Sequence, residues 1–454
     1  MAATISISQR IFPVKRAFGL GAQVGSFFGS ACWLSVKNSL HWMGGQPSSI
    51  FIHGYSSLVR QRLERLGPTF IKLGQIAASR EDILPEIFLQ ELQSLYSQIP
   101  SVPFESIALT IEESLGAPME DLFESIEEKP LGSASIGQVH RAVTFDGQTV
   151  VVKVVKPGVR ELVQADITLL RRVGWCLHFL FPSVSVKTLI DEFATMILRE
   201  IDLRYEAAHI EKFQENFSQY SYIRFPEVDH DLSSEDVLCM ECFQGIVPNE
   251  SLQDELDESV LVQIVEAGTE ALVKMFFVDG FFHADLHPGN LMILEDGSLG
   301  FLDLGMVGVF DKLTRKRLLE LFYAMSQKDW DETLRCLILL SRTTEESDIE
   351  GFKRKVLNLL MYADALHECT ITHQILLILR EAYYHRVHFP TELSLMIKAL
   401  MTYEAVGQSL CPSLNMNDVA KKYVRRVYIQ QYNPIELGVK ILERLPTFIE
   451  TFLT

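Results

Sequence analysis

The sequence predicts an α+β protein with two lobes behind a helical N-terminal region. Residues 1–100 lack strand-like alternation, residues 58–98 carry apolar residues at helical spacing, and residues 101–125 look helical too. Residues 131–155 have the alternating β-branched pattern of a hairpin, and the chain after Gln253 is again mostly helical. Helices, a small sheet and then mostly helices form an α+β order. We therefore expect a helical extension over 1–125, a first lobe over 126–245 and a helical second lobe over 246–454.

Individual elements follow from the same patterns. Strand-like residues on both sides of Phe145-Asp146-Gly147 predict a hairpin, and its second strand contains Lys153. Apolar residues at helical spacing predict one long helix over about 186–217. The run DVLCMECF predicts a strand over 236–243, and residues 283–308 indicate short strands and turns.

Composition restricts the possible partners. The net charge of −18 opposes sequence-independent binding to nucleic acid and to strongly anionic membranes. We therefore predict no nucleic-acid partner and only local or apolar contact with lipid. Seven cysteines, an odd number at irregular spacing, suit reduced thiols in the cytosol. Cys239 and Cys242 have metal-like spacing, but a structural zinc site needs four ligands and no second pair is present.

Two segments are candidates for membrane contact. Residues 17–36 form an uncharged stretch long enough to span a bilayer. Their glycines, serines and glutamine favour a buried or interfacial helix over a transmembrane one, with a secretory signal as the weaker alternative. The amphipathic stretch 437–452 is the second candidate. We predict a cytoplasmic location and leave peripheral membrane association open.

A glycine-containing loop opens the predicted hairpin. It comprises Gly132, Ala134, Ser135, Gly137 and Val139, and a turn of this kind between strands can place backbone N–H groups against phosphates. Turn glycines are common in hairpins, so an ordinary turn remains the alternative.

Lys153 lies at the end of an apolar strand, fourteen positions after Val139. A buried ammonium group is costly without an anionic partner, and phosphate is a natural one. The alternative is a lysine that reaches solvent from the end of its strand.

The run HADLHPGN, which begins at His283, precedes Asp303-Leu304-Gly305 by a short interval. Asn290 and Asp303 would supply an amide oxygen and a carboxylate to magnesium, which prefers oxygen ligands. Asp285 would accept or orient a proton at the attacking oxygen. Two alternatives stay open: a zinc cluster of His283, Asp285 and His287, and a turn that satisfies its own backbone.

Together, the loop, the strand lysine, H-x-D-x-x-x-x-N and D-x-G resemble the parts of protein kinases in order. The details resemble the UbiB family of atypical kinase-like proteins over residues 55–425. The hallmarks are Lys72-Leu-Gly-Gln75, Ala134-Ser-Ile-Gly-Gln138, Glu200-Ile-Asp202 and the run from His283 to Asn290. The resemblance implies a two-lobed kinase-like fold whose helical extension packs over the cleft.

The resemblance also implies ATP and Mg²⁺ as cofactors and a role for each motif residue. Lys153 resembles the phosphate-binding lysine and Glu206 its helix partner. Asp285 resembles the catalytic-loop aspartate, and Asn290 and Asp303 resemble the metal ligands.

The adenine side of the site is implied as well. Met240, Glu241 and Cys242 resemble the hinge that meets adenine through backbone groups. Ala134 replaces the second glycine of the kinase loop, and its Cβ should change nucleotide pose and selectivity. Leu304 replaces the usual phenylalanine, a change that the family often shows.

The N-terminal motif resembles a regulatory element. In the family, its lysine and glutamine engage the Glu-x-Asp pair and block the groove that holds peptide in ordinary kinases. Here these residues would be Lys72 and Gln75 against Glu200 and Asp202, although the residues alone indicate an ordinary helix surface. A continuous helix would place Asp202 and Glu206 on one face at i, i+4, facing either cationic partners or solvent.

The implied function is ATP hydrolysis or small-molecule phosphorylation in support of ubiquinone or isoprenoid-lipid biosynthesis, with a prenylated phenol or quinone-like lipid as partner. Two alternatives remain: a nucleotide-gated protein that binds a lipid or a partner, and a kinase that acts on peptides. The oligomeric state is not predicted. Many bacterial members of the family end in transmembrane helices, so a peripheral member and a soluble form both remain open.

Overall fold

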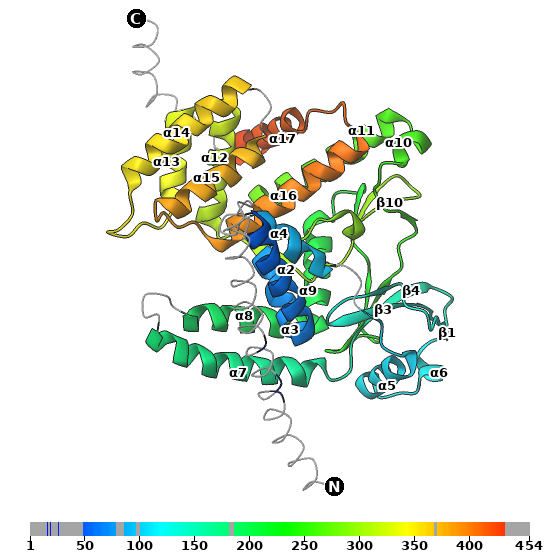
Figure 1. Cartoon of the computed structure of the whole chain (residues 1–454). Helices are drawn as coiled ribbons and strands as arrows, with labels where there is room; N and C mark the ends of the chain where they lie inside the picture. The colour runs from blue at the N-terminus through cyan, green and yellow to red at the C-terminus, as the bar shows by residue number, and fades with distance from the viewer. Residues whose placement is uncertain are drawn as a thin grey trace, which may run out of the picture. The chain divides into compact units, whose positions relative to one another are not determined.

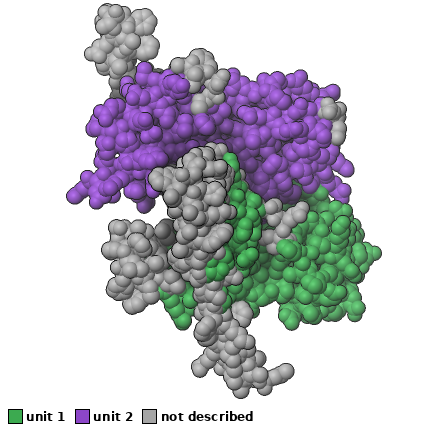
Figure 2. All heavy atoms as spheres, in the orientation of Figure 1, with its two compact units in different colours: residues 1–213, 226–243 green, residues 214–225, 244–454 purple. Residues whose placement is uncertain are grey.

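The computed structural model describes residues 49–78, 86–96, 100–180, 186–366 and 370–431, together with Arg16, Gly19 and Ser26. Figure 1 shows the order of its helices and strands along the chain. The chain divides into two compact units, which Figure 2 distinguishes by colour. Unit 1 comprises residues 1–213 and 226–243, and unit 2 comprises residues 214–225 and 244–454.

The described part of unit 1 includes a group of helices between residues 49 and 96. They are α2 (Ser49–Leu66), α3 (Pro68–Ala78), α4 (Glu86–Gln93) and the 3₁₀ turn η1 (Ser94–Tyr96). Gly67, with φ at +95°, follows α2, and Pro68 begins α3. A glycine just past one helix and a proline at the first position of the next are the favoured boundary residues. The helices pack on one another around Ile71, Leu92 and Leu95.

A six-stranded antiparallel sheet follows in unit 1. Its strands are β1 (Ser125–Ile126), β2 (Gly132–Ser133), β3 (Gly137–Val143), β4 (Thr149–Val155), β6 (Val228–Asp229) and β7 (Val237–Glu241), in the order β1-β3-β4-β7-β6 with β2 beside β3. Val152 and Val154 pack with Ile107 and Ile111 of α5 (Phe104–Leu115). Because side chains alternate along a strand, Lys153 lies on the opposite face of the sheet.

The hairpin expected around Phe145-Asp146-Gly147 is confirmed. β3 and β4 pair from Val143 with Thr149 to Gly137 with Val155, and Gly147 closes the turn with φ at +80°. The short helix α6 (Met119–Leu122) precedes this sheet, and the longer α7 (Val159–Leu180) follows β4.

The single long helix expected over 186–217 is wrong. The structure has two helices, α8 (Val186–Glu200) and α9 (Leu203–Phe217). Asp202 accepts the backbone N–H of Arg204, and the N–H of Leu203 donates to the Glu235 carbonyl at 2.9 Å. Aspartate just before a helix satisfies N–H groups that the first turn leaves without partners, so it starts a new helix here. The i, i+4 relation assumed for Asp202 and Glu206 therefore does not hold.

Unit 2 contains two small sheets. One has the order β5-β11-β10-β8, built from β5 (Ile223–Arg224), β8 (Gly245–Ile246), β10 (Leu291–Leu294) and β11 (Leu299–Phe301). The other pairs β9 (Phe281–His283) with β12 (Val307–Val309), joining His283 to Val307. The connection between β9 and β10 carries the HADLHPGN run, and Asp303 lies between β11 and β12.

The rest of unit 2 is helical. Its helices are α10 (Leu252–Glu255), α11 (Glu258–Lys274), the π-helical turn η2 (Met275–Asp279), the 3₁₀ turn η3 (Pro288–Asn290), α12 (Lys312–Ser326), α13 (Trp330–Leu340), α14 (Ile349–Leu366), α15 (Ile371–Tyr384), α16 (Thr391–Leu410) and α17 (Met416–Gln431). Among the described helices of the chain, none combines the length and apolar character that a membrane crossing requires. Residues 17–36, apart from Gly19 and Ser26, and residues 437–452 lie outside the described part of the chain.

Candidate functional site

In unit 1, Lys153 and Glu206 form a close ion pair. The Lys153 ammonium lies 2.8 Å from both carboxylate oxygens of Glu206, and the two side chains are 19% and 6% exposed. Lys153 projects from the face of β4 opposite the apolar core, and Glu206 lies in the first turn of α9. The structure thus brings together the predicted phosphate-binding lysine and its predicted helix partner.

The Gly132-to-Val139 loop forms a tight turn. Gly132 and Val139 are cross-strand partners, and the N–H of Ala134 donates to the Gly137 carbonyl at 2.9 Å. Ser135, inside the turn, is buried. A Cβ at Gly137 would lie 3.1 Å from the Val154 carbonyl oxygen, so this position favours glycine. Because the Ala134 N–H is used within the turn, a phosphate held here would rely on other groups of the loop.

Lys156 anchors this turn from the residue after β4. Its ammonium donates to the carbonyls of Ala134 at 2.7 Å and Pro100 at 3.1 Å, and its backbone N–H donates to the Ile136 carbonyl. Burial lowers the pKa of Lys156. No motif in the sequence includes Lys156, so the motifs did not predict its role in this turn.

The predicted hinge lies at the end of β7. Met240 is buried, the N–H of Glu241 donates to the Glu227 carbonyl at 2.7 Å, and the N–H of Cys242 donates to the Thr149 carbonyl at 3.2 Å. These two N–H groups belong to the hydrogen-bonding pattern of the sheet. Adenine contacts from Glu241 and Cys242 would therefore come from their carbonyl groups.

The Lys72-to-Gln75 motif lies on α3. Lys72 forms an ion pair with Glu200, the last residue of α8. Gln75 donates to the Leu95 carbonyl at 3.2 Å, and both side chains of the motif are buried. Asp202 pairs with Arg204, and hydrogen bonds from that guanidinium lower the pKa of the Asp202 carboxyl. The structure joins Lys72 to Glu200, as the resemblance implied, while the described bonds of Gln75 and Asp202 lead to different partners.

Gly74 explains how this motif packs. A Cβ at Gly74 would lie 2.8 Å from Leu63 Cδ1 and closer still to Leu95 Cδ1. We expect Gly74→Ala to lower the free energy of unfolding by about 1–3 kcal/mol, since an added methyl group must displace well-packed side chains. Urea unfolding measures this loss. The control is Gly132→Ala, because a Cβ at Gly132 meets no atom within 4 Å. Gly116→Ala is unsuitable as a control because Gly116 has φ at +73°. Equal stability of Gly74→Ala and wild type would contradict the packing argument.

In unit 2, His283 fixes the start of the HADLHPGN run through contacts with the backbone. The N–H of Asp285 donates to His283 Nδ1 at 3.1 Å, and His283 Nε2 lies 3.1 Å from the Leu302 carbonyl. Nδ1 must accept in this arrangement, so Nε2 carries the proton. Burial lowers the pKa of His283, which agrees with a neutral ring.

This buried histidine predicts a pH dependence of stability. Its folded-state pKa lies below the ordinary 6.5, so the unfolded chain binds the proton first as the pH falls. The free energy of unfolding should be highest above pH 6.5 and fall below it, by up to about 1.4 kcal/mol per pH unit from this group. Urea unfolding between pH 7.5 and 5.5 measures the slope, and His283→Gln should show a shallower one. Identical slopes in the two proteins would contradict the prediction.

The Asp285 carboxylate lies between two basic side chains. Oδ1 is 2.9 Å from the ammonium of Lys398 on α16, and Oδ2 is 3.9 Å from His287 Nε2. Asp285 and Lys398 are each 17% exposed, whereas His287 is 45% exposed. Lys398 lies outside every motif, so the motifs did not predict its contact with Asp285. The sequence signal that could have indicated Lys398 is its position between Ile397 and Ala399, two apolar residues that are both buried on α16.

Asn290 and Asp303 come from adjacent segments of unit 2. The side-chain Nδ2 of Asn290 donates to the Asp285 carbonyl at 2.9 Å, which leaves Oδ1 as the atom for a cation. The N–H of Leu302 donates to the Asn290 carbonyl at 2.8 Å, so the residue before Asp303 is tied to the loop. Asp303 is exposed and has φ at +48°. An amide oxygen and a carboxylate fit the oxygen-ligand preference of Mg²⁺.

The zinc alternatives are disfavoured by the same geometry. His283 uses both ring nitrogens for contacts with the backbone. Cys239 is buried in the apolar core of the unit 1 sheet, and burial raises its pKa to about 12, which opposes the thiolate that zinc binds. Among the described residues, no group of three or more His, Cys, Asp or Glu side chains could hold a metal ion.

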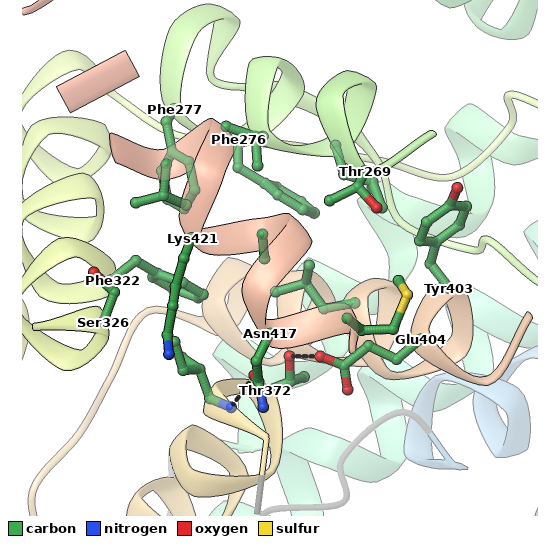
Figure 3. Close-up of a pocket in the computed structure, with 17 residues that line it drawn as sticks. Thr269, Phe276, Phe277, Phe322, Ser326, Thr372, Tyr403, Glu404, Asn417 and Lys421 are labelled. Carbon is green, nitrogen blue, oxygen red and sulfur yellow. Dashed lines mark hydrogen bonds between the residues drawn. The ribbon is translucent and has the colours of Figure 1, made fainter. Parts of the chain in front are cut away.

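Unit 2 also contains a cavity that lies apart from the predicted site residues. It is lined by α11, η2, α12, α15, α16 and α17 and has a volume of about 50 Å³. Figure 3 shows Glu404 and Thr372 joined by a hydrogen bond at its wall. Burial raises the pKa of Glu404. None of the predicted site residues lines the cavity. Its volume suits one or two water molecules and not a nucleotide.

These features define a kinase-like protein. A strand lysine paired with a helix glutamate, an H-x-D-x-x-x-x-N loop and a D-x-G segment are parts that kinases share. Residues 94–337 match the ABC1 atypical kinase-like domain. The chain belongs to the ABC1/UbiB family of atypical kinase-like proteins, which confirms the family predicted from its motifs.

Individual relatives agree with this assignment. A probable protein kinase UbiB of Tolumonas auensis is 30% identical over 91% of this chain and 77% of its own length. The chloroplastic protein ACTIVITY OF BC1 COMPLEX KINASE 7 of Arabidopsis thaliana is 33% identical over 82% of this chain, which spans 54% of that relative. The structure of Rv3197 from Mycobacterium tuberculosis, solved with erythromycin, matches 75% of this chain and 88% of its own, with a TM-score of 0.52 and 24% identity. This last likeness supports the kinase-like fold alone.

Proposed function

We propose that this protein binds Mg-ATP and transfers or hydrolyses its γ-phosphate as an atypical kinase-like ATPase. The observation that carries the proposal is the Lys153–Glu206 ion pair, with both carboxylate oxygens 2.8 Å from one ammonium. Protein kinases require the corresponding lysine–glutamate pair for activity. Family membership supports the same class of activity.

Unit 1 and unit 2, each taken by itself, carry side chains suited to this chemistry. Lys153 would bind phosphate oxygens while Glu206 holds its ammonium in place. Asp285 would accept the proton of the attacking hydroxyl or water. Asn290 and Asp303 would hold Mg²⁺, which when bound neutralises charge on the phosphates. Catalysis of this kind depends mainly on positioning and on charge.

The acceptor belongs to the proposal as well. The family resemblance favours a role in ubiquinone or isoprenoid-lipid biosynthesis, so we propose a prenylated phenol or a quinone-like lipid as partner. We also propose that the protein associates peripherally with membranes. The ion pair between Lys72 and Glu200 supports a regulatory N-terminal motif of the kind that the resemblance implied. Peptide phosphorylation is the less favoured alternative.

The test is phosphate release from ATP by the purified full chain. We expect turnover that requires magnesium and increases when a detergent-dispersed prenylated phenol is added. Tight nucleotide binding without phosphate release under any condition would instead favour a nucleotide-gated binding protein. Efficient labelling of a generic peptide would favour a peptide kinase. Flotation with neutral and anionic vesicles tests membrane contact separately, and recovery only in the soluble fraction would count against it.

A further inference from the structure

The Lys398–Asp285 ion pair joins the catalytic-loop run to a helix far along the chain. α16 packs against β12, and its residues Met396, Ile397 and Ala399 are buried. The Lys398 side chain leaves this mostly apolar stretch and places its ammonium 2.9 Å from Asp285 Oδ1. Both partners belong to unit 2.

Stability alone is a weak explanation for this pair. Each side chain is only 17% exposed, so both charges lose most of their hydration. Replacing a largely buried ion pair with apolar residues is often neutral or stabilising, because the desolvation penalty offsets the attraction. A lysine at this point of α16 is therefore better explained by what it does to Asp285.

The contacts of Asp285 show what that effect would be. Its N–H is held by His283, and its Oδ1 is held by Lys398. On the other side, His287 is 3.9 Å from Oδ2 and carries charge only when protonated. Lys398 therefore places a positive charge beside Asp285 and fixes the orientation of its carboxylate. Asp285 Oδ2 is then the atom that accepts a proton.

We propose that Lys398 is a positioning residue for phosphoryl transfer, acting through Asp285. This inference rests on the proposed function. The acceptor O–H gives its proton to Asp285 Oδ2, the acceptor oxygen bonds to the γ-phosphorus, and the bond between that phosphorus and the leaving oxygen of ADP breaks. Lys398 keeps Oδ1 turned away from the acceptor and adds positive charge beside the group that takes the proton.

The first experiment compares Lys398→Met and Lys398→Arg with wild type. We expect Lys398→Met to lower kcat by about 10- to 100-fold, because a misplaced catalytic group costs about that much. The KM for ATP should stay within about twofold, since Lys398 acts on proton transfer and not on nucleotide binding. Lys398→Arg should recover most of the activity. If Lys398→Met does not fold, Lys398→Gln provides the same comparison.

A matched control separates this role from structural support. Lys274 and Asp279 form another largely buried pair in unit 2, with 12% and 11% exposure and a distance of 2.7 Å. Lys274→Met should lower the melting temperature yet keep kcat per folded molecule. A loss of kcat in Lys274→Met as large as in Lys398→Met would assign both effects to structure and overturn the proposal.

A double-mutant comparison tests whether Lys398 acts through Asp285. Asp285→Asn alone and Asp285→Asn with Lys398→Met should have the same residual kcat, because residues that act as a unit are not additive. Additive losses overturn the inference, as does unchanged or increased turnover in Lys398→Met. An inactive wild type overturns the proposed function and this inference with it, whereas an active wild type beside a fully active Lys398→Met overturns the inference alone.

Discussion

Asp303→Asn should lower magnesium-dependent ATP turnover by about 10²- to 10³-fold while leaving the fold intact. The substitution removes the carboxylate charge proposed to hold Mg²⁺, and the loss of such a charge-stabilising group costs about 10²- to 10³-fold in rate. Asn adopts the left-handed backbone region at least as readily as Asp, so the φ of +48° at this position is preserved. Phosphate release across a magnesium titration measures the effect.

The matched control for this prediction is Asp296→Asn. Asp296 is also an aspartate of unit 2, and its Oδ1 accepts from the N–H and the hydroxyl of Ser298 in a turn. An asparagine oxygen can accept the same bonds, so turnover should stay at the wild-type level. If Asp303→Asn kept full turnover at every magnesium concentration, Asp303 would not be a metal ligand.

Breaking the Lys153–Glu206 pair should have the second large effect, and it should separate stability from activity. Glu206→Gln leaves a largely buried ammonium without its counter-charge, which should cost about 3–5 kcal/mol of unfolding free energy. Combining it with Lys153→Met should restore much of that stability, because neither charge then remains. Turnover should stay at least about 100-fold below wild type in both proteins, since the proposed phosphate ligand is misplaced or absent.

Urea unfolding and phosphate release on the same samples check this separation. Asp191→Asn is the control, because it breaks the Arg171–Asp191 pair of unit 1, whose side chains are 55% and 42% exposed. An exposed pair contributes about 0–1 kcal/mol, so stability and turnover should both change little. Restored turnover in the double variant would show that Lys153 is dispensable for catalysis.

Sequence patterns predicted those elements of the fold that are determined by residues close together in the chain. The hairpin around Gly147 was predictable because alternation and turn residues act over a few positions. The break between α8 and α9 was not recognised, although Asp202 is a favoured N-cap residue, because the apolar spacing continues across it. The single capping residue Asp202 carried less weight in the prediction than the apolar periodicity of residues 186–217.

The residues of the candidate site also fall into those that the sequence predicted and those that it did not. The predictable members are those in motifs, such as Lys153, Asp285 and Asn290. Lys156 and Lys398 were missed because each reaches its partner through tertiary packing, Lys398 across 113 positions of sequence. The hydrogen bond from the Glu241 N–H to the Glu227 carbonyl could not be predicted either, since it depends on which segments lie side by side.

The Lys156 anchor has a consequence for ligand capture. Fixing the backbone of a flexible loop costs roughly 1–2 kcal/mol of conformational entropy per residue. In this protein the ammonium of Lys156 and the Ala134 N–H already tie the turn from Ala134 to Gly137 together. The entropic cost of ordering that loop is therefore met when the chain folds, and an incoming ligand encounters a loop whose shape is already set.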